Sequence, residues 1–300
     1  MRWLLSVPDD FSLQGTLRCS RILLCEPTTV AGFGDRLERI ERLSTHTVTL
    51  LTIYQSTSGL FIHTDSTLTG SEMEEASARI WRMLRLSEDL RCLEHLLHDI
   101  QDSIPLRCVG GRLIRGTTFW EDIVVSALAQ WDSRGSLDLS LVQTLVNCAG
   151  SPFPCNPTRH AFPDADSLLG QRDELELTLG HEEASRVLAV AQAWKTDAER
   201  WRRWQRAPEG VAKLAHLLQG KFGLCRHAVS FFLMRLGKYS FPPDVLGTAE
   251  RPGASDRQRD DLTASRLAEI FNAYPAWAGL IYWLVDWERV TVMDDVSWMT

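Results

Sequence analysis

The segment from Leu218 to Asp244 constrains the fold of this chain more than any other part of the sequence. It reads Leu-Gln-Gly-Lys-Phe-Gly, continues as an apolar run that favours a helix, and ends in Phe-Pro-Pro-Asp. Gly220 and Gly223 predict a tight turn between two helices, because glycine adopts backbone conformations that other residues disfavour. We therefore expect a helical hairpin over residues 210–236, followed by a second turn that presents the carboxylate of Asp244.

The composition is that of a globular protein with room for more than one domain. The chain has 300 residues, of which 44% are apolar, and this is enough for a sizeable core. Apolar runs such as 228–236 and 277–285 are shorter than the roughly 20 residues that a membrane helix needs. The N-terminus has one Arg and a short apolar stretch before Asp9, which is not the pattern of a secretory signal. We expect a cytoplasmic protein.

The cysteines and histidines do not predict a metal site or a cofactor. Seven cysteines are scattered without C-x-x-C spacing, which favours reduced thiols. Cysteines do not cluster after Asp244, which argues against an iron-sulfur cluster there. His95 and His98 are the only close pair of histidines at helical spacing, and a surface pair is favoured over a zinc site because the sequence nearby offers no clear third ligand. We expect no cofactor.

The pattern of apolar residues predicts an α+β protein. Runs rich in β-branched residues between Phe11 and Thr64 predict a small antiparallel β domain, with strands over 16–24, 47–54 and 59–64. A helical pattern follows over 71–98. Glycines at 110 and 111 mark a boundary. We predict an N-terminal β-rich domain with a helix over 1–110 and a mostly α-helical domain over 111–300.

Several helices are expected in the second part of the chain. Thr118 and Glu121 form a capping-box pattern that predicts a helix through Gln130. A long amphipathic helix is expected over 183–204, and the closing helices over 264–274 and 276–286. The polar stretch 247–261 is expected to be a flexible excursion.

The order of several motifs resembles that of the helix-hairpin-helix DNA glycosylases, of the 8-oxoguanine and 3-methyladenine type. The interval from Gly223 to Asp244 is the one that 8-oxoguanine glycosylases show, and Pro242-Pro243-Asp244 is similar to their Pro-x-Asp signature. The segment from Gly111 to Asp122 resembles the start of the helical domain in bacterial members. Tyr274-Pro-Ala-Trp-Ala-Gly resembles their closing helix. The resemblance covers most of residues 110–287.

This resemblance implies a catalytic role for Asp244. Base excision breaks a glycosidic bond through an oxocarbenium-like transition state. A carboxylate can stabilise this cationic transition state or orient the attacking water. An aspartate after two prolines can instead cap a helix. Bifunctional members have a lysine two positions after the last hairpin glycine, where this chain has Cys225. The resemblance therefore implies hydrolysis without strand cleavage.

The resemblance also implies how DNA is bound. The family pattern has one apolar residue between its hairpin glycines, whereas this chain has Lys221 and Phe222 between Gly220 and Gly223. Backbone amides at such a turn approach a DNA phosphate, and a monovalent cation at the hairpin is a candidate partner. The residues that the resemblance assigns to the DNA backbone are Gly220, Lys221, Gly223 and Arg226, and those that it assigns to the wedge are Gln130 and Trp131.

A flipped base is stacked against aromatic side chains, so the sequence must supply a base pocket. Trp120, Trp277, Tyr282 and Trp283 are the candidates. Packing between helices is an equally good interpretation, since eleven tryptophans cannot all line one pocket.

The overall charge counts against a nucleic-acid partner. The formal net charge is −7 and the pI is about 5.6, whereas phosphate contacts come from basic surfaces. A local basic groove would resolve this conflict. Candidates for it are Arg112, Arg115, the run from Trp201 to Arg206, Lys213, Lys221 and Arg226.

Three functions remain open from the sequence. The first is a monofunctional DNA glycosylase of base excision repair, which flips an alkylated or oxidised base out of double-stranded DNA and releases it with Asp244. The second is a catalytically degenerate member that acts as a DNA-lesion-binding or protein-interaction module. The third is a pocket for a free nucleoside or another small molecule.

Overall fold

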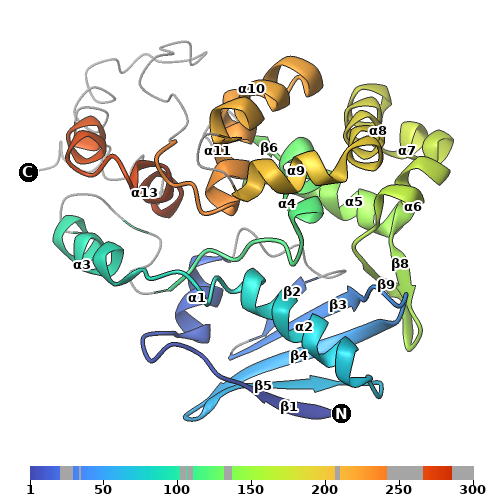
Figure 1. Cartoon of the computed structure of the whole chain (residues 1–300), viewed down its shortest axis with the longest axis horizontal. Helices are drawn as coiled ribbons and strands as arrows, with labels where there is room; N and C mark the ends of the chain where they lie inside the picture. Colours follow the sequence, from blue (N-terminus) through green and yellow to red (C-terminus); the bar gives the residue numbers. More distant parts are fainter. Residues whose placement is uncertain are drawn as a thin grey trace, which may run out of the picture.

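The computed structural model describes residues 1–20, 30–33, 35–101, 106, 111–131, 137–206, 210–241 and 266–285. An antiparallel five-stranded sheet forms the N-terminal part, with strand order β1-β5-β4-β3-β2. The strands are β1 (Arg2–Leu5), β2 (Val30–Phe33), β3 (Arg36–Arg42), β4 (Val48–Ser56) and β5 (Gly59–Thr64). A mostly helical remainder follows, so the predicted α+β fold class is confirmed (Figure 1).

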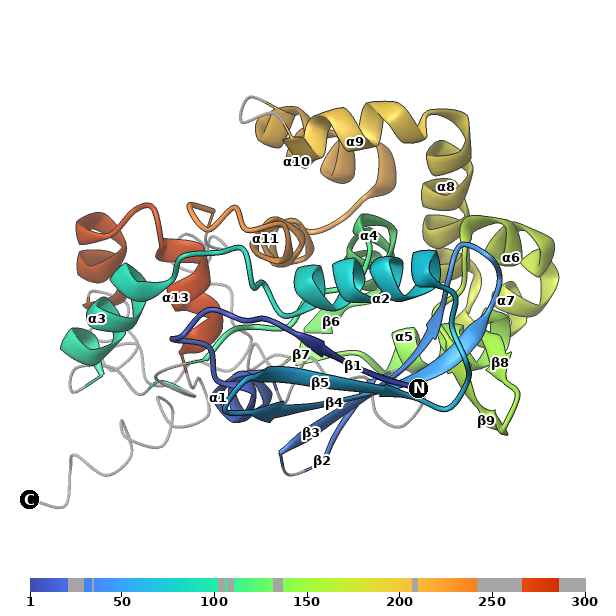
Figure 2. The same ribbon diagram turned by 60° about the horizontal axis from the view of Figure 1, so that its bottom comes forward.

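Alternating side chains of the sheet form its own hydrophobic cluster. Leu51 and Ile53 of β4 are fully buried, and Ile53 faces Ile62 of β5 in the register of the strands. Helix α2 (Gly70–Met83) covers this face with Ile80 and Met83 (Figure 2). Thr69 and Glu72 form a complete capping box that begins the helix.

The predicted strand over 16–24 is wrong over the residues that the structure describes. Helix α1 (Leu13–Cys19) occupies this place, and Ser12 caps it by accepting a hydrogen bond from the backbone N–H of Gly15. Leu13 and Leu17 are four positions apart and both are buried, which is the spacing of a helix face. The cap and this spacing outweigh the β-branched residues.

The helical part surrounds α4, whose residues are all buried. The hydrophobic cluster around α4 is larger than that of the sheet, and it also includes leucines of α3, such as Leu93 and Leu97. The predicted boundary near residue 110 stays a prediction. The helices are α3 (Arg91–Ile100), α4 (Phe119–Leu128), α5 (Ser140–Ala149), α6 (Ala165–Gly170), α7 (Arg172–Leu179), α8 (His181–Thr196), α9 (Ala198–Arg206), α10 (Gly210–Phe222), α11 (Arg226–Arg235) and α13 (Ala278–Leu284), with a further helical stretch over 266–273.

Two short β-hairpins interrupt the helices. β6 (Gln130–Trp131) pairs with β7 (Leu137–Asp138), so the helix predicted through Gln130 ends at Leu128 instead. β8 (Ser151–Phe153) pairs with β9 (Asn156–Ala161) and packs against Ile40 of the main sheet.

The long helix predicted over 183–204 is two helices. Asp197 separates α8 from α9, and its side chain accepts a hydrogen bond from the backbone N–H of Arg200 at 3.0 Å. A side-chain oxygen at this place caps the first turn of a new helix. The break lets α9 change direction, so that Trp201 packs on Trp194 of α8 with ring centroids 6.2 Å apart.

Buried ion pairs join the sheet to the helical part. Arg39 of β3 is bound to Glu41 on its own strand at 2.5 Å and to Glu121 of α4 at 2.8 Å. Asp122 of α4 is bound to Arg82 of α2 at 2.5 Å and to Arg235 of α11 at 2.7 Å. Glu121 therefore holds Arg39 rather than completing the predicted capping box, although Thr118 does cap α4.

Removing one partner from such a pair would leave a buried charge without compensation. Burial alone would lower the pKa of Arg39, but the carboxylates of Glu121 and Glu41 outweigh it and hold this pKa above its ordinary value. Burial alone would raise the pKa of Asp122, but Arg82 and Arg235 hold it below its ordinary value. These ionised groups fix how the sheet and the helices pack.

Among the cysteines that the structure describes, one differs from the expected reduced thiol. Cys92, Cys148, Cys155 and Cys225 are free, as expected. Cys19 is buried and disulfide-bonded, and its partner lies outside the described residues. Among the helices that the structure describes, none is long and apolar enough to cross a membrane.

Candidate functional site

The hairpin between α10 and α11 turns at a single glycine. Helix α10 continues through Phe222, and Gly223 has a φ of +64°, in the left-handed region that glycine favours. The backbone N–H of Gly223 donates to the carbonyl of Gln219, and that of Leu224 to the carbonyl of Leu218. Cys225 then begins α11 as its N-cap.

The prediction that Gly220 also forms the turn is wrong, because it lies within α10. The family pattern has one apolar residue between two glycines, and Phe222 is that residue before Gly223. Lys221 and Phe222, the two residues between the glycines, both lie in the last turn of α10. The Lys221 ammonium lies 5.6 Å from the ring centroid of Phe222.

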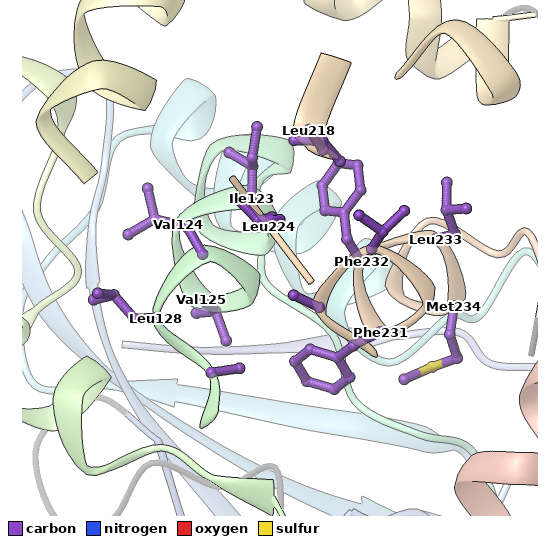
Figure 3. Close-up of a cluster of buried hydrophobic side chains, with 14 of the residues drawn as sticks. Ile123, Val124, Val125, Leu128, Leu218, Leu224, Phe231, Phe232, Leu233 and Met234 are labelled. Atoms are coloured by element: carbon purple, nitrogen blue, oxygen red, sulfur yellow. The ribbon is translucent and has the colours of Figure 1, made fainter. Parts of the chain in front are cut away.

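The hairpin is seated on the core by apolar side chains on both sides of the turn. Phe222 stacks on Trp201 of α9 with ring centroids 5.9 Å apart. Leu218 and Leu224 are buried between α4 and α11. Figure 3 shows them beside Ile123 of α4 and Phe232 of α11. The packed interior holds the turn in place, while Gly223 itself is exposed.

The residues predicted for the DNA backbone come together at this hairpin. Gly220 and Lys221 lie in the last turn of α10, Gly223 follows that helix, and Arg226 begins α11. All four are exposed. The first turn of a helix presents backbone N–H groups that have no intrahelical acceptor, together with the positive end of the helix dipole. An anion such as a phosphate is bound well by this arrangement.

The predicted basic residues divide into two groups. Arg112 is 4% exposed and donates to the carbonyls of Arg85 and Glu88. Arg115 donates to the carbonyl of Arg82, and burial lowers its pKa to about 10. Both arginines serve the packing, and we no longer count them as phosphate ligands. Those on the surface are Arg202, Arg203, Arg206, Lys213, Lys221 and Arg226.

The predicted pocket aromatics also divide into two groups. Trp120 packs on Trp194, and its indole N–H donates to the carbonyl of Pro163 at 2.8 Å, which is a packing role. Tyr282 and Trp283 of α13 are buried against α11, where the ring centroids of Trp283 and Phe231 are 5.1 Å apart. Packing thus accounts for Trp120, and the pocket role of the others stays a prediction.

Tyr282 has a titratable neighbour that sequence reasoning missed. His227 of α11 meets the ring of Tyr282 edge to face, with ring centroids 6.4 Å apart. Partial burial lowers the pKa of His227 below its ordinary value, so the imidazole is mainly neutral near pH 7. A lone histidine two positions after Cys225 carries no motif that could have identified it.

The predicted wedge follows α4. Gln130 is exposed and pairs with Asp138 across the short hairpin of β6 and β7. Trp131 pairs with Leu137 through its backbone. The exposed side chain of Gln130 suits a wedge, and the wedge role itself stays a prediction.

Asp244, with Pro242 and Pro243, lies outside the described residues, but the segment that leads to it is anchored. Helix α11 ends at Arg235, and Gly237, two positions later, has a φ of +79°. The carbonyl of Tyr239 accepts a hydrogen bond from the backbone N–H of Gly279 at 2.5 Å, and that of Phe241 accepts one from the Ser230 hydroxyl at 2.5 Å. Two elements, α11 and α13, thus hold residues 239–241.

The side chain of Tyr239 adds a third anchor. Its ring stacks on Trp277, with centroids 5.5 Å apart and an interplanar angle of 21°. Its hydroxyl accepts from Arg85 at 2.6 Å and donates to Glu88. Sequence reasoning missed Tyr239, because a tyrosine after a glycine turn has no distinctive spacing.

The close pair of histidines lies on the surface of α3, as the sequence favoured. His95 and His98 are both exposed, and His98 contacts Gln101, the C-cap residue of the same helix. Within the described part of the chain, no group of three or more His, Cys, Asp or Glu residues could hold a metal ion.

Comparison with solved structures identifies the architecture. A 3-methyladenine DNA glycosylase from Archaeoglobus fulgidus superposes with a TM-score of 0.65 at 16% identity, covering 99% of each chain. The apo 8-oxoguanine glycosylase/lyase of Clostridium acetobutylicum gives a TM-score of 0.61 at 11% identity, covering 96% of this chain and 98% of that one. The chain has the fold of these DNA glycosylases.

The same fold is seen with DNA bound. A complex of the clostridial enzyme with double-stranded DNA, with cytosine opposite 8-oxoguanine, matches at a TM-score of 0.55 and 14% identity, covering 93% of this chain and 96% of that one. No family model matches the sequence, and no curated protein does. The likeness to these glycosylases is therefore one of three-dimensional structure, at 11–16% sequence identity.

Proposed function

We propose that this chain is a DNA glycosylase of base excision repair that releases an alkylated or oxidised base from double-stranded DNA. The observation that carries this proposal is the agreement of the fold with two DNA glycosylases over at least 96% of the chain. The exposed Gly223 turn supports it, because it offers helix N-terminal amides to a phosphate. The sequence resemblance supports it independently.

The proposed chemistry uses Asp244. The glycosidic C–N bond breaks and its electron pair leaves with the base, while water adds its hydroxyl to the sugar carbon and its proton passes by way of the carboxylate to the base. Asp244 follows the anchored residue Phe241 by three positions in the sequence. Phe241 is bound to α11, the second helix of the hairpin.

Hydrolysis without strand cleavage is the proposed outcome. A lyase step needs an amine that forms a Schiff base with the sugar. Cys225 occupies the position where bifunctional members have their lysine, and its thiol is exposed and free. A thiol cannot form an imine, so the abasic product should stay uncleaved until alkali is added.

The experiment is a panel of duplexes with alkylated, oxidised and deaminated bases, followed by alkali. Asp244→Asn should lower the single-turnover rate of base release by about 10² to 10⁴-fold, because it removes the carboxylate charge but preserves the size and shape of the side chain. Asp99→Asn, an exposed residue of α3, is the matched control and should leave the rate unchanged. Equal rates for Asp244→Asn and the parent protein would reject the mechanism.

The lesion-binding alternative is favoured by one observation: this chain has Lys221 and Phe222 between its hairpin glycines, where the family pattern has one apolar residue. Duplex binding that depends on salt, with no base release from any lesion, would support that alternative over catalysis. Absence of duplex binding at low salt would leave a protein-interaction role.

A further inference from the structure

The cationic side chains are concentrated in one stretch of an acidic protein. Residues 199–226 contain seven Lys and Arg residues and two Glu residues, which leaves 25 basic and 37 acidic residues in the rest of the chain. The stretch therefore has a net charge of +5 and the rest has −12. It comprises α9, α10 and the hairpin turn, which lie side by side (Figures 1 and 2).

Helix α9 has a buried aromatic face and an exposed arginine face. Trp201 and Trp204, three positions apart, point inward, and Trp201 is 2% exposed. Arg202, Arg203 and Arg206 are exposed and recur at the spacing of the opposite face. Of these three, Arg202 pairs with Glu199 at 3.4 Å. Within the described residues, Arg203 and Arg206 have no carboxylate partner.

This arginine face is rigidly connected to the hairpin. Trp201 stacks on Phe222, the residue before Gly223, and also packs against Phe119 of α4. The indole N–H of Trp201 donates to the carbonyl of Ala193 in α8. Because Trp201 and the arginines belong to one helix of nine residues, the arginines keep a fixed position relative to the turn. Isolated surface arginines on a flexible loop would lack this property.

We propose that the exposed face of α9, formed by Arg202, Arg203 and Arg206, is a second site for the DNA backbone beside the hairpin. It binds the phosphates of the duplex outside the lesion and offsets the acidic charge of the rest of the protein. Nine helical residues span about 13 Å, the length of about four phosphates of one strand. This inference rests on the proposed function, since it takes DNA as the partner.

The test is the salt dependence of duplex affinity. Fluorescence anisotropy with a labelled duplex, at several NaCl concentrations, gives the slope of log affinity against log salt concentration. This slope is negative, and its magnitude is about 0.9 for each phosphate contact. The variant Arg202→Gln/Arg203→Gln/Arg206→Gln should reduce the magnitude of this slope by about 2 to 3. It should also bind the duplex more weakly at every salt concentration. Unchanged thermal melting would show that it folds.

A matched control separates a site from net charge. Arg18→Gln/Arg91→Gln/Arg172→Gln removes the same charge from exposed positions on α1, α3 and α7, and should change the slope by less than about 1. An unchanged slope for the α9 variant, or equal changes in both variants, overturns the inference and leaves the proposed function standing. If the parent protein does not bind the duplex at low salt, both proposals fail. Failure of base release alone concerns only the proposed function.

Discussion

Gly220 and Gly223 are three positions apart, yet only position 223 has a backbone conformation that favours glycine. A Cβ at either position would have no neighbour within 4 Å, so space does not distinguish them. The difference is the φ of +64° at Gly223, which costs an L-residue about 1–2 kcal/mol. Gly220 has helical geometry within α10, where alanine is the better residue.

The two glycines therefore form a matched pair of variants. Gly223→Ala should lower the free energy of unfolding by about 1–2 kcal/mol, and should weaken duplex binding because the turn must distort. Gly220→Ala should raise the free energy of unfolding by about 0.5–1 kcal/mol. Urea unfolding and duplex titration measure both effects. Equal effects of the two substitutions would contradict the placement of the turn.

At the scale of elements, α13 acts on the segment that precedes Asp244. Gly279 packs directly on this segment, because a Cβ there would lie 2.8 Å from the carbonyl oxygen of Tyr239 and 2.9 Å from that of Phe241. Neither oxygen can move freely, since the first accepts from Gly279 and the second from Ser230. The position of residues 239–241 thus depends on close contact between backbones.

Gly279→Ala should push the segment away from α13. We expect a loss of about 1–3 kcal/mol in the free energy of unfolding. If Asp244 is catalytic, the single-turnover rate of base release should also fall, with little change in duplex affinity. Gly170→Ala, at the end of α6, is the control, because a Cβ there would meet nothing within 4 Å. A full release rate in Gly279→Ala would show that the reaction does not need this anchor.

At the scale of the whole molecule, ion pairs connect units that are distant in sequence. Asp122 is fully buried and binds one arginine from α2 and one from α11, so it joins the layer over the sheet to the hairpin. Its folded-state pKa is held below the ordinary value of 3.8. A lowered carboxyl pKa contributes stability that is present above pH 3.8 and is lost as the pH falls toward the folded-state pKa.

The stability of the protein should therefore decrease as the pH falls below about 4. Asp122→Asn should cost about 3–5 kcal/mol at pH 7, since it leaves the buried Arg235 and the partly buried Arg82 without their carboxylate. It should also weaken the pH dependence of stability in that acidic window. Urea unfolding between pH 3 and pH 7 measures this. The exposed substitution Asp99→Asn should change neither. A variant as stable as the parent protein at pH 7 would contradict the role of the network.

Local patterns determined the elements whose signals lie close together in the chain. The alternation in β4 and β5, the cap at Thr118 and the glycine at 223 act over a few residues, so the sheet, the start of α4 and the hairpin could be predicted. The order of motifs also identified the glycosylase fold. These predictions succeeded because backbone geometry and apolar spacing act locally.

Only the tertiary structure decided which of several similar residues have which role. It placed Arg112 and Arg115 in the interior but the arginines of α9 on the surface, and it broke the helix predicted over 183–204 at Asp197. Burial and ion pairing depend on segments more than a hundred positions apart, as in the contact of Asp122 with Arg235. A sequence specifies such contacts only through the packing of the whole chain, so no local pattern reveals them.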